Sequence, residues 1–145
     1  MPNEPAWLCA DQIIELNQNV VLDTGEPHSL LSRSLLEGAV AAPQQTFDYD
    51  QRADLVSLAC TLTISVARAH AFLQGNKRTG FVAGMIFLAI NGISIRQAKA
   101  FDEKAADLII AALADKNRFD DFRDWVRKFA QPTGQRIAKP AKPSK

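Results

Sequence analysis

The sequence has little cysteine, and its opposite charges nearly cancel. Its 145 residues include two cysteines, Cys9 and Cys60, too few for a disulfide framework and too isolated for a metal site. Lysine and arginine total 17 against 16 aspartate and glutamate, a net charge of +1. Because neutralising a phosphate backbone demands excess positive charge, the composition argues against direct nucleic-acid binding.

Long apolar runs and targeting signals are also missing. The most apolar segment, Phe81 to Ile90, is about half of the ~20 residues that a membrane span needs. It predicts a buried core helix, and we expect no membrane association. The stretch from Met1 to Gln12 has neither a basic start nor an apolar run, unlike a secretory signal. Together with the two unpaired thiols, this favours a cytoplasmic location.

The composition is that of one ordinary globular domain. Apolar residues make up 47% and charged residues 23% of the chain, and a chain of this length can bury a sizeable core without cross-links. We expect this domain to cover residues 1–132. From Thr133 the sequence is basic, contains prolines and lacks acids, so residues 133–145 are expected to form a disordered tail.

Hydrophobic periodicity predicts an all-α fold. Apolar residues recur at intervals of three and four, the spacing of one helix face. The pattern predicts helices over Asp11–Val21, Ser29–Val40, Asp54–Ala69, Lys77–Ile90, Asp102–Leu113 and Asp120–Phe129. Asp11 is expected to cap the first helix. The Lys77–Ile90 helix is apolar on nearly every side and therefore belongs at the centre of a bundle.

The segment from Ala42 to Gln51 does not fit this pattern. It contains a proline and two aromatic residues, and it shows no helical period. We therefore predict a turn or small hairpin there, forming a short flap.

A polar interruption, AHAFLQGNKRTG, separates two of the predicted helices. Asn76 stands where the central helix begins, so the N–H groups of Lys77, Arg78 and Thr79 are expected to lack intrahelical partners. Such a helix end attracts anions, phosphate above all. The two cations there oppose the helix dipole by ~0.3 to 1 kcal/mol each, and an anionic ligand would remove this conflict.

His70 lies on the other side of the same short loop. A neutral imidazole can accept a proton from an attacking hydroxyl. Phe72 is expected to plug the loop into the core, and Gly75 to permit a positive φ angle or a close backbone approach. Each feature alone has a common structural explanation, because end-of-helix histidines are often caps and lysine–arginine pairs are often solvated surface. Their combination favours a phosphate site.

Two familiar nucleotide-binding patterns do not describe this stretch. GNKRTG lacks the glycine before lysine and the preceding strand that a P-loop requires. The signature set of protein kinases is absent as well.

The stretch HAFLQGNKRTGF instead resembles the motif of the Fic/Doc superfamily, roughly His-x-Phe-x-(Asp/Glu)-Gly-Asn-(Gly or Lys)-Arg, and more closely that of its death-on-curing (Doc) toxin branch. Upstream LLEGAVAAPQQTFDY and downstream MIFLAINGI and FRDWV are similar to parts of Doc-type domains in the same order. The resemblance covers about Trp7 to Phe129. It implies a compact helical domain whose motif loop joins two central helices, with a flap near the site.

The resemblance also implies roles for residues of the motif. His70 matches the general base, Phe72 the buried anchor and Lys77 the lysine typical of the Doc branch. With Lys77 and Arg78, His70 would form the catalytic group. The expected phosphate-binding residues are Arg68, Gly75, Asn76, Lys77, Arg78 and Thr79. For Arg68, a helix-surface arginine is an equally good explanation.

Two positions bear on the reaction that the resemblance implies. Typical Fic adenylyltransferases have glycine where Lys77 stands and a second arginine where Phe81 stands, and both are connected with how ATP is seated. Doc proteins share the differences seen here, and the family's Doc member transfers the γ-phosphate of ATP to a threonine of elongation factor Tu, halting translation. The resemblance therefore favours a kinase with ATP as substrate, and an adenylyltransferase is the alternative.

Gln74 stands where both branches usually carry an acid that binds Mg²⁺. An amide oxygen can be a ligand but lacks the charge that Mg²⁺ sites normally use, so we expect weakened Mg²⁺ binding at this position. A catalytically inactive Fic-fold module that binds a nucleotide or partner is therefore a third possibility. The resemblance further implies an antitoxin partner whose C-terminal segment folds against the toxin.

Overall fold

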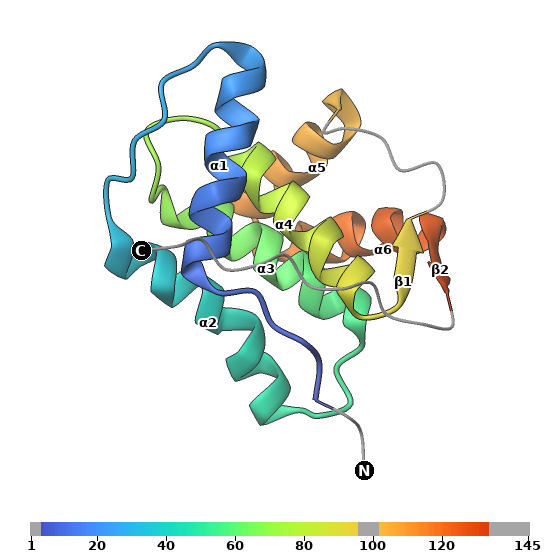
Figure 1. Cartoon of the computed structure of the whole chain (residues 1–145). Coiled ribbons are helices and arrows are strands. Elements are labelled where there is room, and N and C mark those ends of the chain that lie inside the picture. Colours follow the sequence, from blue (N-terminus) through green and yellow to red (C-terminus); the bar gives the residue numbers. More distant parts are fainter. Residues whose placement is uncertain (1–3, 96–101, 134–145) are drawn as a thin grey trace.

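The computed structural model describes residues 4–95 and 102–133, and Figure 1 shows the arrangement of their helices and strands. The helices are α1 (Ala10–Thr24), α2 (Arg33–Tyr49), α3 (Leu55–Ala69), α4 (Asn76–Ile90), α5 (Glu103–Ala114), the short 3-10 helix η1 (Lys116–Arg118) and α6 (Phe119–Phe129). Strands β1 (Ile93–Ile95) and β2 (Ala130–Pro132) pair antiparallel, with Ser94 opposite Gln131. The all-α prediction is confirmed, and the small sheet is an addition to it.

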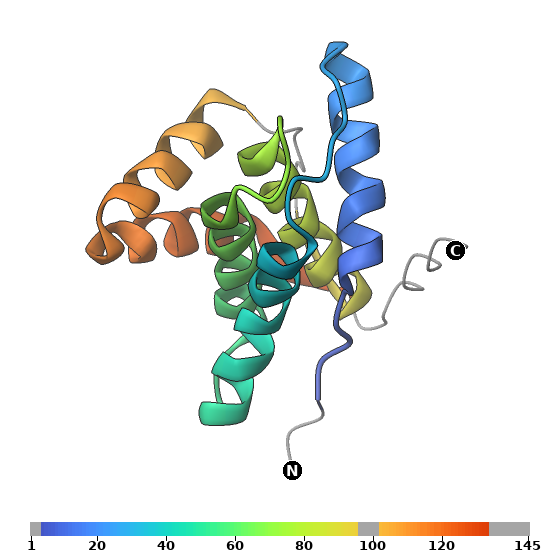
Figure 2. The same cartoon turned by 90° about the vertical axis from the view of Figure 1, so that its left-hand side faces the viewer.

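The two central helices, α3 and α4, are enclosed by the others. Figure 2 shows α1 on one side of this pair and α5 and α6 on the other. α4 contacts α1, α3 and α5, while α2 packs on α3. The prediction of a central helix over Lys77–Ile90 is confirmed, with α4 beginning one residue earlier. The helices α3, α5 and α6 also begin and end within one residue of their predicted bounds.

Small residues let α3 and α4 approach closely. The Thr63 hydroxyl of α3 donates a hydrogen bond of 2.8 Å to the Gly80 carbonyl of α4. A Cβ atom at Gly80 would lie 2.6 Å from the Thr63 carbonyl oxygen, and one at Gly84 would lie 2.9 Å from that of Ala59. A side chain at either glycine would therefore force the helices apart.

The predicted flap over Ala42–Gln51 is wrong, because α2 continues through most of this segment. Pro43 lies inside the helix and has no N–H to donate to the Ala39 carbonyl four residues earlier. The Ser65 hydroxyl of α3 donates to that carbonyl instead, at 2.7 Å. A tertiary hydrogen bond thus satisfies the group that the proline leaves without its helical partner.

The start of α1 also differs from the prediction. Cys9 is the N-cap, and its N–H donates to the Gln12 side-chain oxygen at 2.8 Å. Asp11 lies inside the first turn, where it forms an ion pair of 2.7 Å with Arg33 of α2 instead of capping α1.

α2 begins at Arg33, with Ser32 as its N-cap, and not at Ser29. The preceding residues are held in an extended conformation by an antiparallel bridge between Leu30 and Phe72. This pairing uses residues that a helix from Ser29 would need, so the helix starts four residues later.

Two further predictions concern the ends of the chain and the membrane. The expected tail lies outside the described residues except for Thr133, whose N–H donates to the Gly92 carbonyl at 2.8 Å. Within residues 4–95 and 102–133, no helix combines the length and the apolar character required to cross a membrane.

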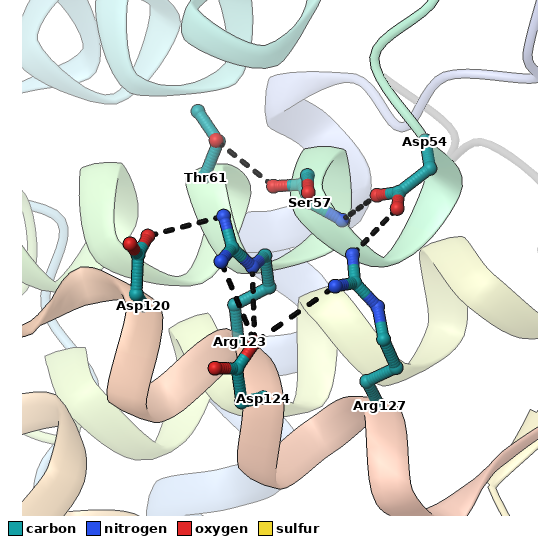
Figure 3. A network of polar contacts seen from close by, with 7 residues as sticks. All are labelled: Asp54, Ser57, Thr61, Asp120, Arg123, Asp124 and Arg127. Atoms are coloured by element: carbon teal, nitrogen blue, oxygen red, sulfur yellow. Dashed lines mark hydrogen bonds and ion pairs between the residues drawn. The ribbon is translucent and has the colours of Figure 1, made fainter.

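One ion pair, between Arg127 and Asp54, joins α6 to the beginning of α3, and further ion pairs lie within α6 (Figure 3). Asp54, the N-cap of α3, accepts a 2.7 Å hydrogen bond from the Ser57 N–H and one of 2.5 Å from Arg127. Burial alone would raise the pKa of Asp54, but the Ser57 hydrogen bonds and the charges of Arg127 and Arg123 outweigh burial and lower it.

We expect Asp54 to make the stability depend on acid pH. A carboxyl whose pKa is lowered on folding stabilises the native state above its unfolded pKa of about 3.9, and this stability is lost as the pH falls through the folded pKa. Asp54→Asn keeps a capping oxygen but removes the titration. In urea unfolding, the wild type should lose stability more steeply than the variant below about pH 4. Parallel pH profiles would contradict the assigned pKa shift.

We expect Ser65 and Pro43 to be energetically coupled. Ser65→Ala should cost about 1 to 2 kcal/mol, because the Ala39 carbonyl loses its donor. In a Pro43→Ala background the alanine N–H can donate to that carbonyl, so the same substitution should cost less than about half as much. A double-mutant cycle measured by urea unfolding tests this, and equal costs in both backgrounds would show that the two residues act independently.

Candidate functional site

The loop from His70 to Gly75 turns the chain from α3 into α4. His70 ends α3 with a left-handed φ of 48°, and Gly75 precedes α4 with a φ of 77°. A Cβ atom at position 75 would lie 3.1 Å from Val21 Cγ1 of α1. The prediction for Gly75 is confirmed both for its positive φ and for the close approach.

The side chain of Asn76 closes this loop. Its Nδ2 donates to the Phe72 carbonyl at 2.8 Å, and its Oδ1 accepts from the Phe72 N–H at 3.0 Å. Phe72 is 1% exposed, so its role as buried anchor is confirmed. Because the Asn76 side chain is engaged within the loop, what it can offer to a phosphate is its backbone N–H.

The donors at the start of α4 lie one residue earlier than predicted. Gly75 is the N-cap, so Asn76, Lys77 and Arg78 carry the N–H groups without intrahelical partners. The Thr79 N–H donates to the Gly75 carbonyl at 2.8 Å, and the Thr79 side chain is fully buried. Thr79 therefore packs the helix and does not face a ligand, which corrects its expected place among the phosphate-binding residues.

Arg78 points back toward α1. Its Nη1 lies 3.5 Å from a carboxylate oxygen of Glu26 and 3.5 Å from the Val20 carbonyl. Both side chains are about one-third exposed, and an ion pair of this kind contributes about 0 to 1 kcal/mol. A phosphate group, which carries more charge and sits at a helix N-terminus, can therefore displace Glu26 from Arg78.

Three other predicted residues are accessible at the same end of the central helix pair. Arg68 and His70 are exposed at the end of α3, and Lys77 is half-buried in the first turn of α4. Within the described parts of the chain, their side chains form no hydrogen bond or ion pair. The short loop thus brings a histidine and several cations to the point where α4 presents its free N–H groups.

The residues of the loop fit a resident metal ion poorly. Gln74 is exposed, and its side chain offers one neutral amide oxygen. Among the described residues, no group of three or more histidine, cysteine or acidic side chains could hold a metal. An Mg²⁺ ion in this place would be held mainly by the phosphates of a nucleotide.

Three residues around the loop were not identified from the sequence: Asn17, Glu26 and His28. Asn17 is fully buried on α1, where it contacts both the loop and α4. Its position four residues after Ile13 on the apolar face was the one available signal, because a polar residue in such a stripe needs a buried partner. Glu26 and His28 lie in the α1–α2 connection, and their sequence context gives no comparable signal.

We expect Glu26→Gln to strengthen ATP binding by about two- to fivefold, because the phosphate no longer has to break the Arg78–Glu26 ion pair. That ion pair contributes at most ~1 kcal/mol. Glu37→Gln is the matched control, since Glu37 pairs with Arg33 on α2. Titration calorimetry with ATP measures both variants. Weaker binding by Glu26→Gln would show that the carboxylate orients Arg78 for the ligand and does not compete with it.

Comparison with known proteins agrees with the resemblance of the motif. The model of the Fic/DOC family matches residues 7–88, more than half of the chain, including the whole loop. "Toxin Doc" of Mycolicibacterium smegmatis (strain ATCC 700084 / mc(2)155) is 44% identical over 77 residues, which are 52% of this chain and 58% of that protein. "Protein kinase doc" of Escherichia phage P1 is 28% identical over 93 residues, 63% of this chain and 70% of that protein. The chain therefore spans less than two thirds of the first relative and more than two thirds of the second. This chain therefore belongs to the Fic/DOC family, whose model covers α1, the motif loop and most of α4.

Proposed function

We propose that the chain is a Doc-type toxin that transfers the γ-phosphate of ATP to a hydroxyl group of a translation protein, with elongation factor Tu as the target. The observation that carries this proposal is the start of α4, where free N–H groups and the cations Lys77 and Arg78 adjoin the exposed His70. The similarity to proteins named Toxin Doc and Protein kinase doc supports both the toxin and the kinase assignment.

In this reaction, an imidazole nitrogen of His70 accepts the proton of the attacking hydroxyl. The hydroxyl oxygen forms a bond to the γ-phosphorus, the bond from that phosphorus to the β–γ bridging oxygen breaks, and ADP leaves. Lys77, Arg78 and the N–H groups at the start of α4 stabilise the charge on the transferred group. Catalysis of this kind depends mainly on positioning and electrostatics.

The environment of Phe81 favours phosphate transfer over the alternative, transfer of AMP. Phe81 is 5% exposed, and its ring centroid lies 6.4 Å from that of Trp125 in α6. The position at which adenylyltransferases typically carry a second arginine is thus part of the core. The adenylylating orientation of ATP would lack that arginine here.

The proposal includes a partner and a compartment. A toxin of this type requires an antitoxin, and we propose one whose C-terminal segment folds as it binds. Such a segment can cover the site of the toxin without any covalent change. Because the proposed target belongs to translation, the toxin acts in the cytoplasm.

We expect His70→Asn to lower phosphate transfer by about 10² to 10⁴, because the general base is lost. Asparagine tolerates the left-handed backbone of position 70, and the exposed His70 side chain has no described partner, so the melting temperature should be nearly unchanged. Intact-mass analysis of elongation factor Tu after incubation with ATP measures the transfer and separates phosphate from AMP. Wild-type transfer by the variant would exclude His70 as the base, and an AMP adduct would exclude the kinase.

We expect Gln74→Asp to lower the Mg²⁺ concentration for half-maximal transfer at least about fivefold, because one unit charge contributes ~1 kcal/mol at 4 Å even in water. Gln74→Asn has the same shape without the charge and serves as the control. An identical Mg²⁺ dependence in both variants would contradict a metal role for position 74. If ATP binds but neither the wild type nor Gln74→Asp transfers phosphate, the chain is a nucleotide-binding module without turnover.

A further inference from the structure

Asn17 connects α1 to both sides of the motif loop. Its side chain is fully buried, and its Nδ2 donates to the Gln74 carbonyl at 2.8 Å and to the Thr79 hydroxyl oxygen at 3.0 Å. Its Oδ1 lies 2.7 Å from His28 Nδ1. One amide therefore contacts the loop, the first turn of α4 and a histidine of the α1–α2 connection.

The chemistry of these partners fixes the orientation of the amide. The Gln74 carbonyl can only accept a hydrogen bond, so the atom facing it must be the donating nitrogen of Asn17. The oxygen of Asn17 then faces His28 and can only accept, so His28 Nδ1 must carry a proton. When His28 is neutral, its Nε2 is consequently the unprotonated nitrogen.

The two groups that accept hydrogen bonds from Asn17 lie on opposite sides of the point where the motif loop joins α4. The Gln74 carbonyl belongs to the peptide that enters Gly75, directly before the free N–H groups, and Thr79 lies in the first turn of α4. Because Asn17 uses both amide hydrogens, a change at position 17 removes the hydrogen bonds that tie the Gln74 carbonyl and the Thr79 hydroxyl to α1. The Asn76 bonds to the Phe72 backbone remain, but they hold the middle of the loop and not the peptide that links Gln74 to Gly75.

We propose that Asn17 is a positioning residue for phosphate transfer: it holds the loop that follows His70 in register with the phosphate-binding start of α4, and His28 donates a hydrogen bond from Nδ1 to its amide oxygen. This inference rests on the proposed function for its effect on turnover. The effects of Asn17 on the order of the loop and on the tautomer of His28 do not depend on that function.

A second buried amide provides a matched control. Asn91, at the other end of α4, donates to the carbonyls of Ala6 and Phe87 at 3.0 and 2.8 Å, and it accepts from the Ala6 N–H at 2.8 Å. It thus also uses both amide hydrogens and its oxygen. The 15 residues of α4 separate it from the motif loop, about 22 Å along the helix axis. A carboxylate in place of either amide loses the two donors.

The test compares Asn17→Asp with Asn91→Asp in the full chain, using phosphate transfer to elongation factor Tu. Asn17→Asp should lower kcat by about 10², the effect of a misplacement of about 1 Å. Its KM for ATP should stay within about threefold of the wild type, because the phosphate donors lie on α4 itself. Asn91→Asp should keep kcat. Equal losses of kcat in the two variants would mean that Asn17 acts only through stability, and the proposal would be overturned.

Two readouts stay informative if a variant folds poorly or the wild type proves inactive. In a ¹H–¹⁵N spectrum of the wild type at alkaline pH, His28 should be protonated on Nδ1, and protonation on Nε2 would overturn the inferred amide orientation. Hydrogen exchange at residues 73–75 should quicken in Asn17→Asp but not in Asn91→Asp. If both results are as expected while the wild type transfers no phosphate, the loop register stands and the proposed function fails. Unchanged exchange in Asn17→Asp would overturn the register itself.

Discussion

The close contact between α3 and α4 is the constraint on which the site depends. Thr63 donates to the Gly80 carbonyl across this contact, and no side chain fits at Gly80 or Gly84. With the helices held at this distance, the six residues from His70 to Gly75 must reverse the chain within a short span. The left-handed conformations at both ends of the loop follow from that requirement. The exposed His70 and the free N–H groups of α4 are thereby brought to one end of the pair.

The electrostatics of this end are unfavourable without a ligand. Lys77 and Arg78 add positive charge where the helix dipole is already positive, and Glu26 offsets it only through a partly exposed ion pair. A site arranged in this way is held by the surrounding packing and is stabilised when an anion binds. Structural order in the loop therefore comes from neutral groups, chiefly the Asn76 bonds to the Phe72 backbone and the Asn17 bridge.

The helices that are determined by a local pattern of apolar residues could be predicted from the sequence. The apolar stripes marked α3 and α5 to within one residue, and the structure adds that Asp54 and Asp102 are the N-caps of these helices. The continuation of α2 past Pro43 could not be predicted, because it depends on a hydroxyl donated from another helix. Thr79 was misplaced because the choice of N-cap between Gly75 and Asn76 shifts the free donors by one residue. The Asn17 contacts join residues far apart in the chain and leave little trace in the local pattern.

The binding of an ATP phosphate at the start of α4, beside His70, is what the proposed function requires above all. Backbone amide shifts in ¹H–¹⁵N spectra, recorded while ATP is added to the wild type and to Arg78→Ala, test it directly. We expect the largest shifts on the amides of Asn76, Lys77 and Arg78, and a lower affinity in the variant. The largest shifts on a distant surface, such as the hollow between the start of α1 and α2 that Trp7 and Gln44 line, with an affinity indifferent to Arg78, would contradict it.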